Sequence, residues 1–171
     1  CAGEMGAVKR PETAIQAFGK SGLAEKGYSL LFAGNCREER ETELMLVANE
    51  SGVADKVRFL GYVPDIKPLM SKATAYLMCS EFEGLGRVTI EAMFYGCPVI
   101  ARRSGGTLEI IFDRRNGFFF DTVEECSELM NMLASALPLD VVREAQKDAV
   151  SRYSEEEYGR EIMRVYKYLT R

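Results

Sequence analysis

Residues 79–106 limit the folds open to this chain more than any other stretch, because strand-like and helix-like segments alternate there at short intervals. The apolar run that leads into them, residues 73–80, has the length of a strand covered on both faces. Residues 88–95 have the length of a helix with apolar positions suited to burial, and Gly96 follows as a C-terminal stop. A second strand is expected at residues 98–101. This order of elements is typical of a parallel sheet.

Glycines lie in the turns on both sides of that helix. Gly84 and Gly86 separate the first strand from the helix, and Gly105 and Gly106 follow the second strand. Glycine allows backbone conformations that a Cβ atom forbids and lets a ligand approach the backbone closely. The unpaired N–H groups at the start of the helix carry a partial positive charge that suits a phosphate. We therefore expect an anionic ligand at the first turn.

Two carboxylates, separated by seven residues, flank that turn. Glu83 lies in the loop before the helix, and Glu91 is expected in about its first turn. A carboxylate accepts two hydrogen bonds at once and can hold a pair of neighbouring sugar hydroxyls. The stretch therefore predicts a site for a phosphate-bearing ligand with hydroxyls at both ends, such as a nucleotide-sugar. The alternative is that the helix dipole alone favours acidic residues here.

The rest of the sequence continues the alternation. Strands are expected at residues 29–33, at residues 57–63 and within residues 116–122, and helices at residues 38–51, at residues 64–73 with a break near Pro68, and throughout residues 123–171. In the last stretch, two apolar sets recur at helical spacing: Cys126, Leu129, Met130 and Leu133, then Tyr158, Ile162, Val165, Tyr166 and Leu169. The alternation predicts one α/β domain over residues 1–171. Its sheet would be doubly wound, Rossmann-like and mostly parallel, with helices on both faces.

Ligands bind such sheets beyond the carboxyl ends of the strands. Gly34, Tyr62 and both glycine turns fall at predicted strand carboxyl ends, so the local and global predictions agree.

Composition excludes several functional classes. The 171 residues carry a formal net charge of −4, which provides no basic surface for nucleic acid. The sequence holds no run of 18 apolar residues, so no membrane span is expected. Histidine is absent, which rules out His-based catalysis and His metal ligands within the chain. The five cysteines show no C-x-x-C spacing, which favours reduced thiols of a cytoplasmic protein and indicates no zinc site.

The central stretch closely resembles the donor-binding signature of retaining glycosyltransferases of the GT-B fold. The matching residues are Ser80, Glu83, Gly84, Leu85, Gly86, Glu91, Ala92, Met93, Gly96, Pro98, Val99, Ile100 and Ala101. The resemblance implies that the chain is the C-terminal, donor-binding half of a GT-B architecture.

The resemblance extends to the opening of the chain, where Gly3, Lys9 and the pair Ala17 and Phe18 fall at matching places. It implies that Lys9 is the family's donor-phosphate lysine. Glu4 departs from the family, which has an arginine at that position. Either Arg10 takes the arginine's role, or the donor is held differently.

The resemblance also implies the roles of individual residues. Lys9 and Glu83 would be catalytic, with Glu83 holding sugar hydroxyls and Glu91 the ribose diol. The other donor-binding residues would be Tyr62, Val63, Gly84, Leu85, Gly86, Arg87, Val88, Thr89, Gly105, Gly106 and Thr107. For Arg103 two roles stay open, a phosphate contact or a place on the surface. Neither a metal nor another cofactor is expected, because the helix and the lysine supply the positive charge.

As a function, the resemblance implies transfer of a sugar from a nucleoside-diphosphate sugar to a saccharide or lipid-linked acceptor, in bacterial surface polysaccharide or glycoconjugate synthesis. The acceptor site is expected in an N-terminal domain that is absent from this chain, so the chain alone would be inactive. A membrane-peripheral location of the full-length protein stays open. Two alternatives remain: a catalytically inactive nucleotide-sugar-binding domain, and half of a GT-B-fold nucleotide-sugar epimerase.

Overall fold

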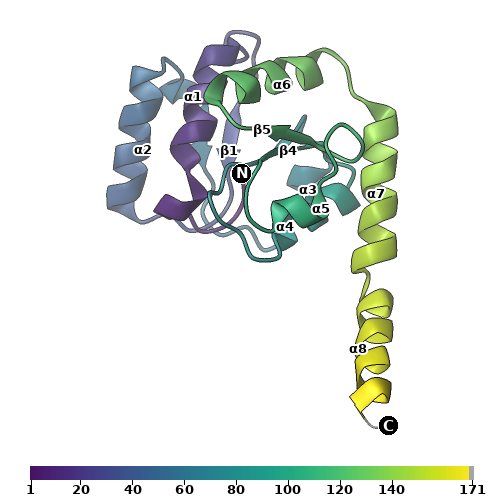
Figure 1. The fold of residues 1–171 in the computed structure, drawn as a ribbon. Coiled ribbons are helices and arrows are strands. Elements are labelled where there is room, and N and C mark those ends of the chain that lie inside the picture. The colour runs from purple at the N-terminus through teal and green to yellow at the C-terminus, as the bar shows by residue number, and fades with distance from the viewer. Residues whose placement is uncertain (170–171) are drawn as a thin grey trace.

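The computed structural model describes residues 1–169 as alternating helices and parallel strands (Figure 1). In chain order the elements are η1 (Ala7–Lys9), α1 (Pro11–Ser21), β1 (Leu30–Phe32), α2 (Glu38–Glu50), η2 (Ala54–Lys56), β2 (Val57–Phe59), α3 (Lys67–Met70), β3 (Tyr76–Met78), α4 (Arg87–Phe94), β4 (Val99–Arg102), α5 (Thr107–Ile110), β5 (Phe118–Phe120), α6 (Val123–Ser135), α7 (Leu139–Tyr153) and α8 (Glu155–Leu169). The predicted α/β class is confirmed.

The three-stranded sheet, in the order β3-β4-β5, is covered on both faces. Its strands are parallel, and successive side chains point to opposite faces, as the two-residue period of a strand requires. One set packs toward α1 and α6: Leu77, Cys79, Ile100, Phe118 and Phe120. The other set packs toward α4, α5 and α7: Tyr76, Met78, Val99 and Ala101. This double burial explains why β3 and β4 stand out in the sequence as continuous apolar runs.

The two-stranded sheet, β1 and β2, is less well covered. Leu30 and Phe32 of β1 point into the core beneath α1 and α2, and the Phe32 ring stacks on Phe59 at 5.1 Å between centroids. Leu31, between them, remains 37% exposed on the other face. The burial of this sheet is therefore one-sided.

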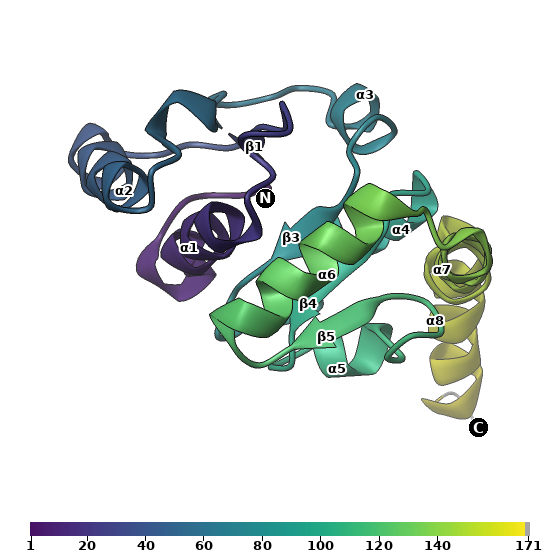
Figure 2. The ribbon, with the colours of Figure 1, turned by 90° about the horizontal axis from the view of Figure 1, so that it is seen from above.

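The division into two sheets differs from the single continuous sheet that the sequence predicts. The opening segment, residues 1–3, lies between β1 and β3 (Figure 2), but it forms only one parallel bridge, between Ala2 and Ala33. β2 is also shorter than predicted. It ends at Phe59 instead of residue 63, because Gly61 takes a positive φ of 64° that turns the chain.

The helix after β3 agrees with the sequence to within one residue. α4 spans Arg87–Phe94, whereas residues 88–95 were predicted. Gly86 precedes it with a φ of 62°, and Gly96 follows it with a φ of 75°. Both glycines therefore hold left-handed conformations that other residues rarely adopt.

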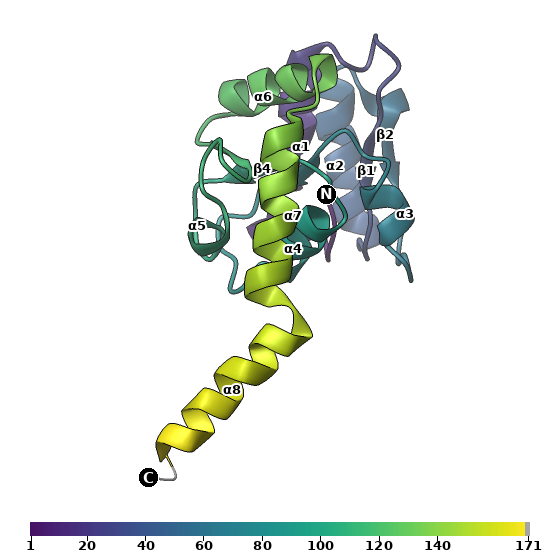
Figure 3. The same ribbon diagram turned by 90° about the vertical axis from the view of Figure 1, so that its right-hand side faces the viewer.

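The C-terminal third is helical, as predicted, but it forms three separate helices. In α6, Cys126, Met130 and Leu133 are buried as their spacing predicts. α8 extends away from the body (Figures 1 and 3). Of the apolar positions predicted for it, Ile162 is half-buried, and the other four are exposed: Tyr158, Val165, Tyr166 and Leu169. The helical prediction for residues 170 and 171 lies outside the described residues. Among the described helices, none has both the length and the apolar character needed to cross a lipid bilayer.

Candidate functional site

The carboxyl ends of the strands meet at one edge of the molecule, where glycines allow the backbones to approach each other. The Gly34 amide donates to the Gly61 carbonyl oxygen at 2.7 Å. Gly34 also packs against Gly3 so closely that a Cβ atom on Gly34 would lie 2.1 Å from the Gly3 carbonyl oxygen. The opening segment, β1 and β2 therefore end side by side, as the sequence predicts for a ligand-binding edge.

Lys9 and Glu83 form the centre of the candidate site. They are 74 positions apart in the sequence, and the Lys9 ammonium forms an ion pair with Oε1 of Glu83. The Ser80 hydroxyl donates to the same Oε1 atom at 2.7 Å. The side chains of Lys9 and Glu83 are 30% and 14% exposed, so the pair is partly shielded from water while remaining open to a ligand.

The loop after β4 closes against the loop of Glu83. The Gly106 amide donates to the Glu83 carbonyl oxygen at 2.8 Å. A Cβ atom on Gly106 would lie 1.5 Å from the Gly84 carbonyl oxygen, and one on Gly105 would lie 2.8 Å from the Glu83 amide. These contacts show why both positions after β4 must be glycine. The structure thus brings together Lys9, the Glu83 loop and the loop of Gly105 to Thr107.

α4 begins directly after the loop that contains Glu83. The Arg87 and Val88 amides, the first two of α4, have no hydrogen-bond acceptor within residues 1–169, whereas the Thr89 amide donates to the Gly86 carbonyl oxygen at 2.8 Å. The helix dipole makes this end partly positive. Arg87 is exposed and Val88 is half-buried, while the Thr89 hydroxyl is buried without a hydrogen-bond partner within residues 1–169. Leu85, just before Gly86, is exposed. These positions border the Glu83 loop but make no side-chain hydrogen bond with it in the described structure.

The second carboxylate lies farther along the helix than predicted. Glu91 is the fifth residue of α4 and so belongs to its second turn, because α4 begins at Arg87. Its side chain is exposed and makes no hydrogen bond or ion pair within residues 1–169. It is therefore available to a ligand.

The loop after β2 reaches the same edge through the backbone. Gly61 joins it to Gly34, and the next residue, Tyr62, is 74% exposed. Val63 is half-buried. The structure brings neither side chain into contact with the Lys9–Glu83 pair.

Glu4, where the chain departs from the resembled family, lines a hollow of about 330 Å³ whose lining does not include Lys9. Arg37 and Arg40 line the same hollow. Glu4 therefore shares its surroundings with two guanidinium groups and with two other carboxylates, Glu39 and Glu43. Local patterns in the sequence could not predict this arrangement, because the hollow is lined by the opening loop together with the start of α2.

Two further arginines are engaged outside the central pair. Arg10 pairs with Glu81 on the surface. Arg103 lies between Asp113 and Asp121, at 3.3 Å from each, and its guanidinium stacks over the Phe119 ring. These contacts favour the surface role for Arg103.

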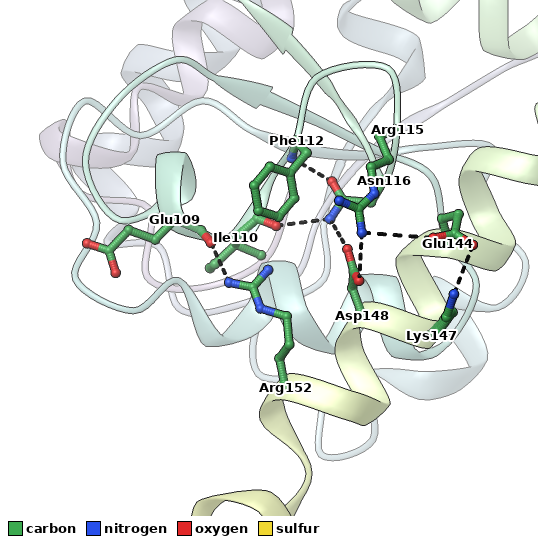
Figure 4. Close-up of polar contacts among 9 residues, drawn as sticks. All are labelled: Glu109, Ile110, Phe112, Arg115, Asn116, Glu144, Lys147, Asp148 and Arg152. Atoms are coloured by element: carbon green, nitrogen blue, oxygen red, sulfur yellow. Dashed lines mark hydrogen bonds and ion pairs between the residues drawn. The ribbon is translucent and has the colours of Figure 1, made fainter. Parts of the chain in front are cut away.

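A polar network joins α5, and with it the second glycine turn, to α7 (Figure 4). The buried amide of Asn116 donates to the Ile110 carbonyl oxygen at 3.1 Å and to Asp148 at 2.8 Å. Arg152 adds a hydrogen bond to the Glu109 carbonyl oxygen at 2.8 Å. The end of α5 is thus held in place, which fixes the loop that closes on Glu83.

The sequence analysis did not assign two serines that shape the site. Ser80 orients Glu83, and the Ser104 hydroxyl donates to the Ser80 carbonyl oxygen at 2.8 Å, which links the ends of β3 and β4. The resemblance names Ser80, three residues before Glu83, as a matching residue but gives it no role. Within residues 1–169 no three Cys, Asp or Glu side chains are grouped to hold a metal ion. The expectation of a metal-independent site stays a prediction.

Comparison with known proteins gives consistent matches. A sequence model of the family described as glycosyl transferases group 1 matches residues 1–152. The chain is 31% identical over 144 residues to phosphatidyl-myo-inositol mannosyltransferase of Mycobacterium leprae, covering 80% of this chain and 37% of that protein. It is 36% identical over 84 residues to the lipopolysaccharide core biosynthesis glycosyltransferase LpsE of Rhizobium meliloti, covering 49% and 24%.

Solved structures share the fold. Anabaena HepE in complex with UDP superimposes with a TM-score of 0.86 at 24% identity, covering 98% of this chain and 48% of HepE. The C-terminal domain of the group 1 glycosyl transferase LpcC from Francisella tularensis gives a TM-score of 0.79 at 21% identity, covering 90% of this chain and 84% of that one. The chain thus spans about half of HepE and less than two fifths of these two curated relatives.

Proposed function

The chain belongs to the family of glycosyl transferases group 1, and on that premise we propose that it is the donor-binding domain of a retaining glycosyltransferase. The enzyme would move a sugar from a nucleoside-diphosphate sugar to a saccharide or lipid-linked acceptor, in the synthesis of a bacterial surface polysaccharide or glycoconjugate. The acceptor would bind a further domain of the full enzyme. The relatives named for lipopolysaccharide core synthesis and for mannosylation of phosphatidyl-myo-inositol support this class of product.

The observation that carries the proposal is the meeting of Lys9 and Glu83 at the glycine-lined strand edge. Lysine has three N–H donors, so Lys9 can keep one bond to Glu83 and offer the others to a diphosphate. Glu83 accepts from Lys9 and Ser80 through Oε1, and its Oε2 atom makes no hydrogen bond within residues 1–169, so it can accept from sugar hydroxyls. The transferred sugar would then lie between the two residues.

The remaining residues would bind the rest of the donor. The first amides of α4 would receive the diphosphate together with Lys9. Glu91 would accept hydrogen bonds from the ribose diol, and the backbone near Tyr62 and Val63 would meet the base. The backbones of Gly105, Gly106 and Thr107 would border the sugar.

Transfer breaks the bond between the sugar C1 atom and the phosphate oxygen, whose electron pair leaves with the diphosphate. The acceptor oxygen forms the new bond to C1 on the same face. The departing phosphate oxygen, on that face, can take the proton of the acceptor hydroxyl. Lys9 and the positive end of α4 stabilise the negative charge that develops on the diphosphate. We expect no metal to be needed.

The test is calorimetric titration of this chain with UDP-, GDP-, ADP- and CDP-sugars. One nucleotide class should bind, and Lys9→Met should weaken its binding by about 10- to 100-fold, the value of a hydrogen bond to a charged group. Lys26→Met, which removes an exposed lysine far from the site, is the matched control. Binding that Lys9→Met leaves unchanged would reject the assigned site, and the absence of any binding would reject the proposed function for this chain.

A further inference from the structure

The hollow of about 330 Å³ that Glu4 lines has no part in the donor site proposed above. One wall of it is the opening loop, residues 4–7, and the other wall is formed by residues between 35 and 43, at the start of α2. Pockets for small molecules have volumes of about 300–1,000 Å³. The hollow lies at the lower end of this range and therefore suits a ligand the size of a single ring.

The two walls of the hollow are held in place by contacts within the chain. The Met5 amide donates to the Asn35 carbonyl oxygen at 3.0 Å, and the Met5 side chain is buried in the core. Arg40 forms an ion pair with Glu12 of α1 and another, at 2.9 Å, with Glu43 of its own helix. The hollow is therefore formed without a ligand, and its Arg40 and Glu43 side chains already satisfy each other.

Other side chains in the lining remain unpaired. The following make no side-chain hydrogen bond or ion pair within residues 1–169, and all are exposed: Glu4, Asn35, Arg37 and Glu39. Carboxylates accept hydrogen bonds, a guanidinium donates them, and an amide side chain does both. Two unpaired carboxylates face one unpaired guanidinium, so the hollow repels a phosphate, while Arg37 repels an ammonium group. A neutral ligand with several hydroxyl groups fits this lining best.

The hollow and the proposed nucleotide site lie on opposite faces of the sheets. α1 and α2 bury their apolar side chains in one hydrophobic cluster, and α3 and α4 bury theirs in the other. The start of α4 and the loop before α3 are the parts proposed to receive the diphosphate and the base, whereas the hollow lies at the start of α2. The opening loop joins the two places, because it lines the hollow through Ala7 and reaches Lys9 two residues later. A second sugar ring can thus lie in the hollow while the nucleotide keeps its own place.

We propose that the hollow binds a neutral sugar ring of the acceptor. This inference rests on the proposed function: it makes the acceptor a saccharide and assigns part of its binding to this domain. Glu4, Glu39 and Asn35 accept hydrogen bonds from ring hydroxyls, and Arg37 donates to hydroxyl oxygens. An arginine in place of Glu4 would reverse the balance of unpaired charge and favour an anion. The glutamate at this position therefore selects an uncharged ligand.

The test is a titration of the ¹⁵N-labelled chain with the methyl α-glycosides of glucose, mannose, galactose and N-acetylglucosamine, followed by NMR at the Gly6 and Asn35 amides. At least one glycoside should shift these amides saturably, with a dissociation constant of about 1–10 mM, because one ring makes only a few hydrogen bonds. Glu4→Ala and Arg37→Gln should each raise that constant by at least about fivefold. Glu50→Ala removes an exposed carboxylate at the far end of α2 and is the matched control.

The proposal is overturned if no glycoside gives a saturable shift, or if Glu4→Ala and Arg37→Gln bind the glycoside as the unmodified chain does. A stronger response of the same amides to inorganic phosphate than to every glycoside would also overturn it, since the hollow would then be an anion site.

Calorimetry with the donor distinguishes the two possible sources of the sugar ring. If Glu4→Ala weakens binding of the nucleotide-sugar but not of the nucleotide alone, the hollow holds the sugar of the donor, and the assignment to the acceptor is wrong. The proposed function fails separately, when the unmodified chain binds no nucleotide-sugar. Donor binding that depends on Lys9, together with no glycoside binding, would reject the saccharide site alone.

Discussion

The two sheets differ in how they are held, although both lie in one small fold. Helices cover the three-stranded sheet on both faces, and its residues divide evenly between two hydrophobic clusters. The two-stranded sheet buries only the face beneath α1 and α2. The candidate site combines residues from two halves of the domain. Glu83 and both glycine loops follow strands of the three-stranded sheet, which is covered on both faces, whereas Lys9 follows the opening segment, which pairs with the two-stranded sheet. The difference indicates that the half with the three-stranded sheet is packed more tightly and positions the Glu83 carboxylate, which is proposed to bind the sugar. The half with the two-stranded sheet is packed less tightly and supplies the Lys9 ammonium group.

The largest expected effect tests that contrast directly. Phe120 is completely buried in the three-stranded sheet, and Phe120→Ala should lower the free energy of unfolding by about 3–5 kcal/mol. Leu31→Ala, in the less covered face of β1, should cost only about 1 kcal/mol, because Leu31 is already 37% exposed and loses less buried apolar surface. Urea denaturation measures both. Similar losses in the two variants would contradict the proposed difference between the halves.

A second, smaller effect comes from the boundary between the halves and depends on pH. The Cys1 amino group has a pKa of about 6 in the folded chain, against an ordinary value of 8.0, because of desolvation; the Cys79 and Cys97 thiols oppose this shift weakly. Between pH 6 and pH 8 the unfolded chain binds more protons, so the free energy of unfolding should rise with pH in this window.

The upper bound of that rise is about 2.7 kcal/mol, from 1.36 kcal/mol per unit of pKa difference, and solvent screening of the partly exposed Cys1 reduces it. Urea denaturation at pH 5.5, 7 and 8.5 measures the rise. Acetylation of the amino group serves as the control, because it removes the titration. If the free energy of unfolding of the unmodified chain does not change across this window, the Cys1 amino group is open to water in the folded chain.

The same contrast explains what the sequence could reveal. β3 and β4 are doubly buried and therefore appear as continuous apolar runs, and α4 is bounded by Gly86 and Gly96, so all three elements were predicted in place. The bounds of β4 and α4 agree to within one residue, whereas β3 spans only Tyr76–Met78 of the predicted residues 73–80. The gap between the sheets was missed, because it depends on pairing between residues 2 and 33 and on the absence, within residues 1–169, of a second strand partner for β3 besides β4. Local periodicity contains no information about such distant pairs.

The candidate site was predictable in part for a similar reason. The glycines of both turns were predicted to let a ligand approach the backbone, and the structure shows that they also let the two loops approach each other, at Gly106 and Gly84. The ion pair between Lys9 and Glu83 joins residues 74 positions apart and could be expected only through the family resemblance. The surroundings of Glu4 could not be inferred, because Arg37 and Arg40, which line the same hollow, lie at the start of α2, more than 30 positions along the chain.

The smallest expected effect concerns the second ion pair between the halves, Arg10 with Glu81. Both side chains are about half exposed, in contrast to the partly shielded pair of Lys9 and Glu83. An exposed pair gains little, because water screens the attraction and ordering two long side chains costs entropy. Arg10→Met should therefore change the free energy of unfolding by no more than about 0.5 kcal/mol. Methionine keeps a Cβ atom at this position, where φ is 47°, so backbone strain is the same in both forms.

Urea denaturation in 0.1 M and 1 M NaCl measures this change, and the higher salt should reduce it further. A loss above about 1 kcal/mol would mean that the surface pair, and not the apolar packing of α1 on α6, holds the Lys9 half against the Glu83 half. The position of Lys9 would then depend on ionic strength, and the affinity for a diphosphate would fall in Arg10→Met as well. If the change in the free energy of unfolding is small, the Lys9 ammonium group is positioned by the hydrophobic core that both halves share.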